Sequence, residues 1–519
     1  MMAVSRLLGL ASLATTSLHA VSASLAQLQQ PLFDDAHQVA LTQGEKPLVD
    51  SEALQNSISI DRLLKGAQDL YDIANLSSHE YNRPTRVIGS EGHLGTLDYI
   101  RKSISELGDY YEILEQPFPA YVGWVQEFRL VIGNDFYEAA QPMSLTPPTK
   151  DREPVRGDLV LVDNTGCSSE DYPSSVKGNI AFIRRGTCSF GDKSAQSGKA
   201  GAIAAVIYNN EKGELSGTLG TPDDNHVATF GIPLVDAEPL LKKLEDNETV
   251  DAIAYISSWV NSAITKNIVI QTVEGDPNSC VALGAHSDSV EAGPGINDDG
   301  SGTLSLLEVA RQLTKFRVNN CVRFAWWSAE EEGLVGSSYY ASNLSRDENL
   351  KVRLFMDYDM LASPNFAYQV YNATNDAHPV GSEELRDLYV EWYEAHDLNY
   401  TFIPFDGRSD YDGFIRAGIP AGGIATGAEV VKTKEEREMF GGRAGEAFDE
   451  CYHLLCDDTG NVNVTAWELN TKLVAHSVAT YAASFEGFPK RDSDALRANS
   501  LETNKYAQTV KYRGDYLFI

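Results

Sequence analysis

Hydrophobic and polar positions follow two different periods along the chain, and each period predicts a different kind of element. In residues 61–76 the apolar side chains recur at helical spacing, and a second stretch of this kind follows Gly92. Residues 111–114 and 127–132 have the alternation and composition of two separate strands. The first part of the folded chain is therefore expected to begin with two helices and to continue into β-structure.

The pattern changes after a proline-rich stretch at residues 142–154, which we interpret as the boundary of an insertion. Residues 157–257 contain short strands separated by glycine turns, which is typical of a small β-rich unit. From residue 267 to residue 485 strands and helices alternate. That alternation predicts an α/β layer fold with a mainly parallel sheet.

The chain has 519 residues, of which 42 are Lys or Arg and 74 are Asp or Glu, so its formal net charge is −32. Nucleic-acid phosphates and anionic membrane surfaces repel such a charge, and we predict neither as a partner. The hydrophobic fraction of 43% is ordinary for globular proteins and argues against general disorder. This length is sufficient for roughly two to four domains.

The N-terminus has the composition of a secretory signal peptide. Arg6 precedes a short apolar run, and Val21, Ser22 and Ala23 fit a small-x-small cleavage pattern. The apolar run is too short to span a bilayer, which argues against a membrane helix. We assign residues 1–23 to the signal peptide and the polar residues 24–58 to a candidate propeptide.

Two further features agree with export. Six acceptor sequences for N-glycosylation occur, at Asn75, Asn247, Asn343, Asn372, Asn399 and Asn463. The six cysteines are an even number, which suggests disulfides in an oxidising compartment, although six cysteines allow fifteen pairings. Proximity favours Cys451 with Cys456. Cys167 and Cys188 fall in the β-rich unit, and Cys280 and Cys321 would pair by elimination.

Three strand-like segments of the alternating region end in histidine or acidic residues. Residues 281–285 run into His286 and Asp288, residues 321–327 into Glu330, Glu331 and Glu332, and residues 352–356 into Asp357 and Asp359. In open α/β sheets ligands bind beyond the carboxyl ends of the strands, so these side chains are expected to converge. Two further candidates are the Asp298-Asp299 pair before a predicted helix and His453 between two cysteines.

Each of these motifs alone has a more ordinary explanation. His-x-Asp is usually a surface hydrogen bond, a glutamate run is usually a solvated helix start, and Asp-Asp-Gly is usually a turn or an N-cap. Their joint occurrence at strand ends favours a metal site, because imidazole and carboxylate ligands suit zinc and one carboxylate can bridge two ions. A set of His, Asp, Glu, Asp and His is what two zinc ions require for hydrolysis.

Several ordered segments match one known enzyme family. They are Gly284-Ala285-His286-Ser287-Asp288-Ser289, residues 293–302, Ala329-Glu330-Glu331, residues 359–365, Gly407-Arg408-Ser409-Asp410 and Cys451-Tyr452-His453. With these segments, residues 267–485 resemble the zinc aminopeptidases of the MH clan. Residues 179–210, around Arg185-Gly186-Thr187-Cys188 and Lys199-Ala200-Gly201-Ala202, resemble a protease-associated (PA) domain. The combination is similar to secreted and vacuolar fungal aminopeptidases.

The resemblance implies a role for individual residues. For the metal ligands, His286 and Asp359 would bind one zinc ion, Glu331 and His453 the other, and Asp298 would bridge both. For catalysis, Glu330 would be the general base, Asp288 would orient His286, Tyr452 would donate a hydrogen bond to the developing oxyanion, and Arg408 would position the substrate. The peptide bond after Asp298 is expected to be cis.

The acidic run departs from the family pattern. Relatives usually have two glutamates followed by an apolar residue, whereas Glu332 is a third glutamate here. Alignment on the following Gly333 to Ser337 favours Glu330 and Glu331 as the functional pair, with Glu332 as the alternative.

The resemblance also implies the architecture. We expect a three-layer α/β peptidase domain with a mixed, mainly parallel sheet and an inserted, small, β-rich PA domain. The expected boundaries are residues 59–130 for the first part of the peptidase domain, 131–257 for the PA domain, 258–487 for the rest of the peptidase domain and 488–519 for a charged tail.

The function implied is that of a secreted aminopeptidase with two zinc ions, and the vacuole is the alternative location. Its substrates would be peptides with a free N-terminus that begin with an apolar or neutral residue, leucine preferred. We expect a monomer. One alternative is an MH-clan zinc carboxypeptidase. Such enzymes bind the C-terminal carboxylate with arginines, and Arg408 is the one obvious candidate in the motif region, which disfavours this alternative. The other alternative is an inactive protein that displays its PA domain for binding.

Overall fold

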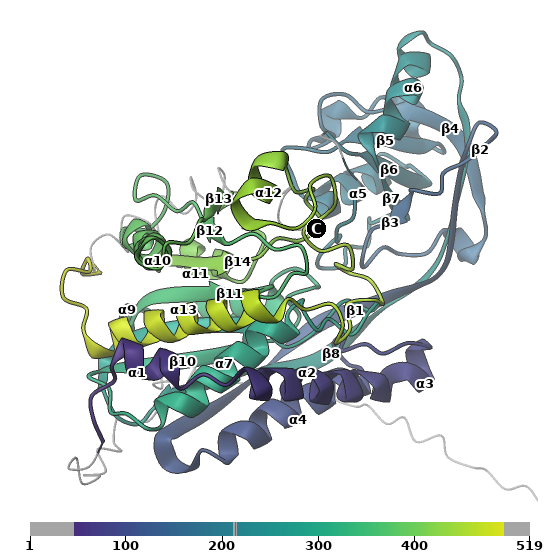
Figure 1. Ribbon diagram of the computed structural model, residues 1–519. Helices are drawn as coiled ribbons and strands as arrows, with labels where there is room; N and C mark the ends of the chain where they lie inside the picture. Colours follow the sequence, from purple (N-terminus) through teal and green to yellow (C-terminus); the bar gives the residue numbers. More distant parts are fainter. Residues whose placement is uncertain (1–45, 211–212, 214, 406, 492–519) are drawn as a thin grey trace, which may run out of the picture.

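The computed structural model describes residues 46–210, 213, 215–405 and 407–491 (Figure 1). The predicted signal peptide, most of the candidate propeptide and the tail beyond residue 491 lie outside the described residues. Figure 1 shows a larger part with helices packed around a sheet, and a smaller part at the far end of a long two-stranded ribbon. Among the described helices, none combines the length and the apolar character needed to cross a membrane.

The larger part is built on strands in the order β13, β12, β14, β11, β9, β10 and β8. Their bounds are β8 (Asp251–Thr272), β9 (Asp276–His286), β10 (Asn320–Trp327), β11 (Val352–Tyr358), β12 (Gln369–Tyr371), β13 (Thr401–Ile403) and β14 (Ala421–Ala425). The central strands β10, β9, β11 and β14 are parallel, whereas β8 is antiparallel to β10 and β12 is antiparallel to β14. The predicted α/β fold with a mixed, mainly parallel sheet is confirmed.

Helices cover both faces of this sheet, because its central strands are apolar on both sides. In β11, Leu354 and Met356 belong to one apolar cluster and Phe355 belongs to another on the opposite face. The first cluster includes residues of α2 (Ile60–Ala74), α4 (Glu91–Ser105), α7 (Gly300–Leu313), α10 (Ser382–Ala395) and α13 (Val464–Ala483). The second includes residues of α8 (Val335–Asn343) and α11 (Tyr411–Arg416). The two predicted N-terminal helices are confirmed as α2 and α4.

Short helices complete the description. They are α1 (Ser51–Asn56), α3 (Ser78–Tyr81), α9 (Arg346–Lys351) and α12 (Lys434–Phe440), with the 3-10 turns η2 (Asn75–Ser77), η3 (Gly108–Tyr110), η4 (Lys150–Arg152), η5 (Ser169–Asp171) and η6 (Ser174–Val176). Helix α1 is part of the folded domain, since Leu54 is completely buried and Ser51 Oγ lies 2.7 Å from His476 Nδ1 of α13. Residues 46–58 of the candidate propeptide are therefore packed on the peptidase core.

The ribbon corrects one expectation. The strands predicted separately at residues 111–114 and 127–132 form one strand, β1 (Tyr111–Ile132), which pairs antiparallel with β8 along its length. Pro117 and Pro119 are accommodated within this strand, because proline is tolerated in an edge strand, where a backbone N–H can point to solvent. The register shifts only once, at a bulge between Val125 and Glu127. The chain therefore enters the smaller part within β1, ahead of the proline-rich stretch.

The smaller part has its own sheet in the order β4, β5, β6, β7 and β3, joined to the ribbon where β4 pairs with β8. Its elements are β2 (Asp135–Phe136), β3 (Gln141–Pro142), β4 (Val155–Leu161), β5 (Ile180–Arg184), α5 (Phe190–Lys199), β6 (Ala204–Tyr208), β7 (Thr229–Ile232) and α6 (Leu234–Glu245). Two apolar clusters, distinct from those of the peptidase sheet, lie on the faces of this second sheet.

Three disulfides are present, and all three predicted pairings are confirmed: Cys167–Cys188, Cys280–Cys321 and Cys451–Cys456. The first closes a loop in the smaller part. The second joins the starts of β9 and β10, at the end of the sheet opposite the candidate site. The third encloses His453 in a loop of the larger part.

Candidate active site

The candidate residues lie where the parallel strands of the larger part end. His286 is the last residue of β9, Asp359 follows β11, and Glu330 and Glu331 follow β10. Asp298 lies in the turn before α7. Because β9, β10 and β11 are parallel neighbours, their carboxyl ends meet at one edge of the sheet, and these side chains converge as expected.

Asp298 lies between the two histidines. Its Oδ1 is 3.1 Å from Nε2 of His286, and its Oδ2 is 3.2 Å from Nε2 of His453. Asp359 Oδ1 lies 3.8 Å from the same nitrogen of His286, and Glu331 Oε2 lies 3.2 Å from that of His453. The five predicted metal ligands therefore form two groups that share the carboxylate of Asp298.

The donor atoms of these groups are suited to a cation. Two sets of side chains lie close enough to hold an ion, namely His286 with Asp298 and Glu331, and His286 with Asp299 and Asp359. Within the described part of the chain, Asp359 Oδ1 has no hydrogen-bond partner although it is buried. Imidazole nitrogen and carboxylate oxygen are zinc ligands, so this set fits zinc.

The carboxylate of Asp299 is hydrogen-bonded to backbone amides. Its Oδ1 accepts hydrogen bonds from the N–H groups of Gly302 and Met360, and its Oδ2 accepts one from the N–H of His286. These bonds tie the start of α7 to the ends of β9 and β11. The peptide bond between Asp298 and Asp299 is cis, as expected from the family resemblance.

Glu331 and Glu332 occupy different environments. Glu331 Oε1 accepts a hydrogen bond from the N–H of Val290 at 3.0 Å, which leaves Oε2 facing His453. Glu332 is buried, and its Oε2 has no hydrogen-bond partner among the described residues. The geometry thus brings Glu331, the residue favoured by the alignment, to His453.

Buried carboxylates control the protonation of this site. Burial, followed by the neighbouring charges of Glu331, Asp410 and Asp359, raises the pKa of Glu330 well above its usual value. Burial also raises the pKa of Asp298, but hydrogen bonds from His286 and His453 outweigh it, and its pKa is below the usual value. The site therefore favours the charged form of Asp298 and the protonated form of Glu330.

Asp288 contacts more than the ring of His286. Nδ1 of His286 lies 3.2 Å from the carbonyl oxygen of Asp288 but 3.9 Å from its Oδ1. The carboxylate accepts hydrogen bonds from the backbone N–H groups of Glu330 and Glu331, each at 3.3 Å. Asp288 thus contacts the imidazole mainly through its backbone, and its side chain fixes the loop that carries the two glutamates.

Comparison with known proteins agrees with this geometry. Residues 267–478 match the model of peptidase family M28, and residues 155–240 match that of the PA domain. Aminopeptidase Y of Saccharomyces cerevisiae is 50% identical over 485 residues, covering 91% of this chain and 88% of the relative. The chain belongs to peptidase family M28. Leucine aminopeptidase 2 of Arthroderma otae is 42% identical over 456 residues, covering 87% of this chain and 90% of the relative.

A solved structure confirms the fold of this M28 peptidase. The aminopeptidase from Aneurinibacillus sp. strain AM-1 superimposes with a TM-score of 0.67 at 27% identity, covering 84% of this chain and 96% of that chain. The family and the PA domain inferred from the sequence motifs are both confirmed. The smaller part of the molecule, from β4 to α6, is therefore the PA domain.

Two further predicted residues of the M28 peptidase lie beside the cluster. The ring of Tyr452 stacks on that of His453, with centroids 3.8 Å apart. Burial, then the charge of Asp298, raises the pKa of Tyr452 well above its usual value, so its hydroxyl keeps the proton that it could donate. The guanidinium of Arg408 lies 3.9 Å from the carboxylate of Glu429. The next residue, Ser409, donates a hydrogen bond from Oγ to Asp359 Oδ2 at 2.9 Å.

Two positioning residues were missed by sequence reasoning. Arg86 is completely buried and donates hydrogen bonds to the carbonyl oxygens of Ser287, Pro294 and Gly295, in the segment between His286 and Asp298. Asp457, one residue after the Cys451–Cys456 loop, accepts hydrogen bonds from the backbone of the Asp298 turn. Arg86 lies in a polar loop without a motif. The position of Asp457 directly after the loop of His453 was the available signal.

Proposed function

We propose that this M28 peptidase is an aminopeptidase that binds two zinc ions, with Asp298 as the ligand shared by both. His286 and Asp359 would complete one zinc site, and Glu331 and His453 the other. The observation that carries this proposal is the position of Asp298, whose two oxygens face two different imidazoles at 3.1 and 3.2 Å. A carboxylate with one oxygen toward each of two ligand groups has the arrangement of a bridging ligand.

Zinc, when bound, would polarise the scissile carbonyl and lower the pKa of water, so that hydrolysis proceeds at neutral pH. Glu330 accepts the proton of the attacking water and later returns it to the leaving amine. Its raised pKa, caused by burial and by nearby carboxylates, suits a group that must both take and release a proton. A bound cation would offset part of that rise.

Tyr452 and Arg408 would act on the substrate itself. Tyr452 donates a hydrogen bond to the developing oxyanion from a ring held against His453. Arg408 lies in the loop that is fixed to Asp359 through Ser409, and it positions the substrate near the reacting carbonyl. Asp288 keeps Glu330 and Glu331 in place through their backbone N–H groups.

A carboxylate beside the metal ligands supports action at N-termini. Glu330, which is not one of the proposed ligands, would hold the α-ammonium group of a free N-terminus through a charge-assisted hydrogen bond. Relatives named aminopeptidase Y and leucine aminopeptidase 2 support this direction of cleavage. We propose peptides with an apolar or neutral first residue, leucine preferred, as substrates of a monomeric glycoprotein of the secretory pathway, either secreted or vacuolar.

The decisive experiment compares leucyl peptides that carry a free amine with the same peptides acetylated at that amine. Sequential release of residues from the N-terminus of the free peptides only, followed by mass spectrometry, is the expected result. Acetylation removes the ammonium charge and the charge-assisted hydrogen bonds that it makes. Equal cleavage of both forms, or release from the C-terminus, would contradict the aminopeptidase function, and no cleavage of either would favour a binding role.

A further inference from the structure

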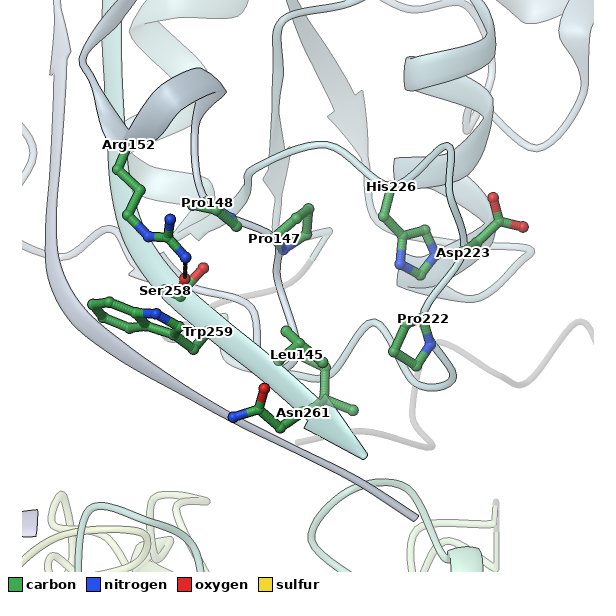
Figure 2. Close-up of a pocket in the computed structure, with 11 residues that line it drawn as sticks. Leu145, Pro147, Pro148, Arg152, Pro222, Asp223, His226, Ser258, Trp259 and Asn261 are labelled. Atoms are coloured by element: carbon green, nitrogen blue, oxygen red, sulfur yellow. Dashed lines mark hydrogen bonds between the residues drawn. The ribbon is translucent and has the colours of Figure 1, made fainter. Parts of the chain in front are cut away.

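A pocket of about 390 Å³ lies between strand β8 and the PA domain, apart from the candidate active site. Figure 2 shows β8 on one side and the loop of Pro222, Asp223 and His226 on the other, with Pro147 and Pro148 between them. Its volume falls in the range of sites that bind small ligands or single side chains. Neither the metal cluster nor the family match assigns it a function.

The walls of the pocket suit an apolar ring. Leu145, Pro147, Pro148, Pro222 and Trp259 supply apolar surface. Trp259 is fixed in place, because its ring stacks on Trp124 with centroids 5.2 Å apart and Arg152 lies 4.7 Å from its centroid. Arg152 is fixed in turn by a hydrogen bond to the carbonyl of Ser258 (Figure 2). A rigid aromatic wall of this kind binds apolar side chains with little loss of entropy.

One polar group in the wall lacks a partner. Nδ1 of His226 is buried and has no hydrogen bond within the described residues. Burial lowers the pKa of His226, which favours the neutral ring and leaves a nitrogen able to accept a hydrogen bond. A buried acceptor without a partner costs free energy, and a ligand that donates an N–H to it would remove that cost.

The strand that forms one wall leads from the pocket to the candidate active site. Ser328, two residues before Glu330, donates a hydrogen bond to the carbonyl of Lys266 in β8, and Ala329 packs in one cluster with Ala263. The pocket contacts β8 at residues 258–261. At about 3.4 Å per residue of strand, Val260 is about 10 Å beyond Ala263. The pocket is therefore a few residues of extended chain away from the catalytic loop.

The edge of β8 between the pocket and Lys266 continues beyond the carboxyl end of β10. On its second side β8 pairs with β4 at residues 251–254 and with β10 at residues 268–271, and no described strand pairs with the edge in between. Loop residues occupy the carbonyls of Ile256, Ser258 and Lys266, so the stretch left for a peptide is residues 259–265. The partner on the first side is β1 throughout. Because β10 and β9 lie on the uncovered side, the open edge borders the carboxyl ends of the catalytic strands.

We propose that this pocket is a distal subsite for the peptide substrate, which binds an apolar side chain, best a proline or aromatic ring, several residues beyond the cleaved bond. The proposal rests on the aminopeptidase function proposed above. An extended substrate would leave the catalytic loop along the open edge of β8, where strand edges accept peptides through main-chain hydrogen bonds. Each residue of an extended chain spans about 3.3–3.6 Å, so the side chain in the pocket would be about three to five residues past the scissile bond.

The test compares a long and a short substrate on the same enzyme variants. Asn261→Arg places a large charged side chain at the pocket from an exposed position, and His226→Ala removes the unpartnered acceptor. Gln126→Arg is the matched control, because it makes the same kind of change at an exposed position of the adjoining strand that does not line the pocket. The substrates are leucine 4-nitroanilide and a leucyl octapeptide with proline or phenylalanine at positions four to six.

We expect Asn261→Arg and His226→Ala to lower kcat/KM for the octapeptide, the first by roughly tenfold, which is the loss expected when one apolar side chain can no longer be buried. Hydrolysis of leucine 4-nitroanilide should stay unchanged in both variants, and Gln126→Arg should leave both substrates unaffected. An equal loss on both substrates, or no loss on the octapeptide, would overturn the distal subsite while the aminopeptidase function stands. If the unaltered enzyme hydrolyses neither substrate, the proposed function itself fails.

Discussion

Asp457 Oδ2 accepts a hydrogen bond from the backbone N–H of Asp298 at 3.1 Å, and Asp457 Oδ1 accepts one from the preceding N–H at 2.9 Å. One buried carboxylate thus fixes two successive amides of the turn that carries the proposed bridging ligand. Because Asp457 directly follows the disulfide loop of His453, the same residue joins the histidine of one proposed zinc site to the carboxylate shared by both.

Asp457→Ala should therefore lower both zinc affinity and activity. Partners that orient metal ligands typically contribute about 10–100-fold to metal affinity or rate, and we expect a loss in that range. Metal content after dialysis against a graded chelator, measured beside kcat, checks the prediction. Asp458→Ala is the neighbouring control, since the Asp458 carboxylate caps the N–H of Gly460 instead. Unchanged zinc affinity in Asp457→Ala would mean that the Asp298 turn holds its geometry without this carboxylate.

Glu330→Ala should retain zinc and lose activity. The variant removes the proposed general base but none of the proposed ligands, and base removal typically costs on the order of 10²–10⁴-fold in kcat. Kinetics on a leucyl substrate together with metal analysis provide the measurement. Glu332→Gln is the matched control, and it should keep most of the activity. Loss of metal in Glu330→Ala, or a larger kinetic loss in Glu332→Gln, would exchange the roles of these glutamates.

Removal of the metal should abolish activity and also lower the melting temperature. An ion that binds only the folded chain stabilises it, so that removing the ion removes this contribution to the free energy of unfolding. Dialysis against a chelator followed by addition of zinc should restore both activity and melting temperature. Full activity in a preparation shown to be free of metal would contradict the zinc proposal.

His476 predicts a pH dependence of stability. Burial, then the charge of His396, lowers the pKa of His476 to about 4, against an ordinary value of 6.5. The folded state therefore favours the neutral ring, whose Nδ1 contacts Ser51 Oγ. This stabilisation is complete above pH 6.5 and is lost as the pH falls towards 4, because the unfolded chain binds the proton first. The contribution is on the order of 3 kcal/mol.

Comparison of unfolding free energies for the unaltered protein and His476→Gln between pH 4 and pH 7 tests this dependence. The difference between the two proteins should be largest near neutral pH and should shrink towards pH 4. His79→Gln, at an exposed position, is the control and should leave the profile unchanged. A difference that stays constant across this range would show that His476 contributes packing alone.

The sequence predicted the residues at the strand ends because a parallel sheet brings those ends together whatever lies between them. Knowing that His286, Asp298 and Asp359 follow strands or precede a helix was therefore enough to expect their convergence. Arg86 could not be found in this way, since it acts on the carbonyl oxygens of a segment more than two hundred positions away in the chain, and any residue type provides a carbonyl.

The role of Asp288 and the length of β1 show the same limit. The family resemblance implied that Asp288 would orient His286, but which of its oxygens contacts the ring depends on the loop of Glu330, which competes for the carboxylate. Residues 115–126 were left outside the two predicted strands, whereas the long pairing with β8 keeps that stretch extended. Local propensity is overridden in both places by a partner that is remote in the chain.

The ribbon of β1 and β8 makes the PA domain the elongated tip of a single hairpin. The domain enters and leaves through adjacent backbone positions, since the N–H of Gly133 donates to the carbonyl of Asp251 at 2.7 Å. An insertion whose ends touch can be exchanged without a change in the distance between the segments that flank it. At any residue pair of β1 and β8 from Tyr111–Thr272 to Gly123–Val260, a short turn could close the hairpin in place of the domain. The peptidase sheet is thus a scaffold on which the inserted module could be replaced while the register of β8 beside the loop of Glu330 is kept.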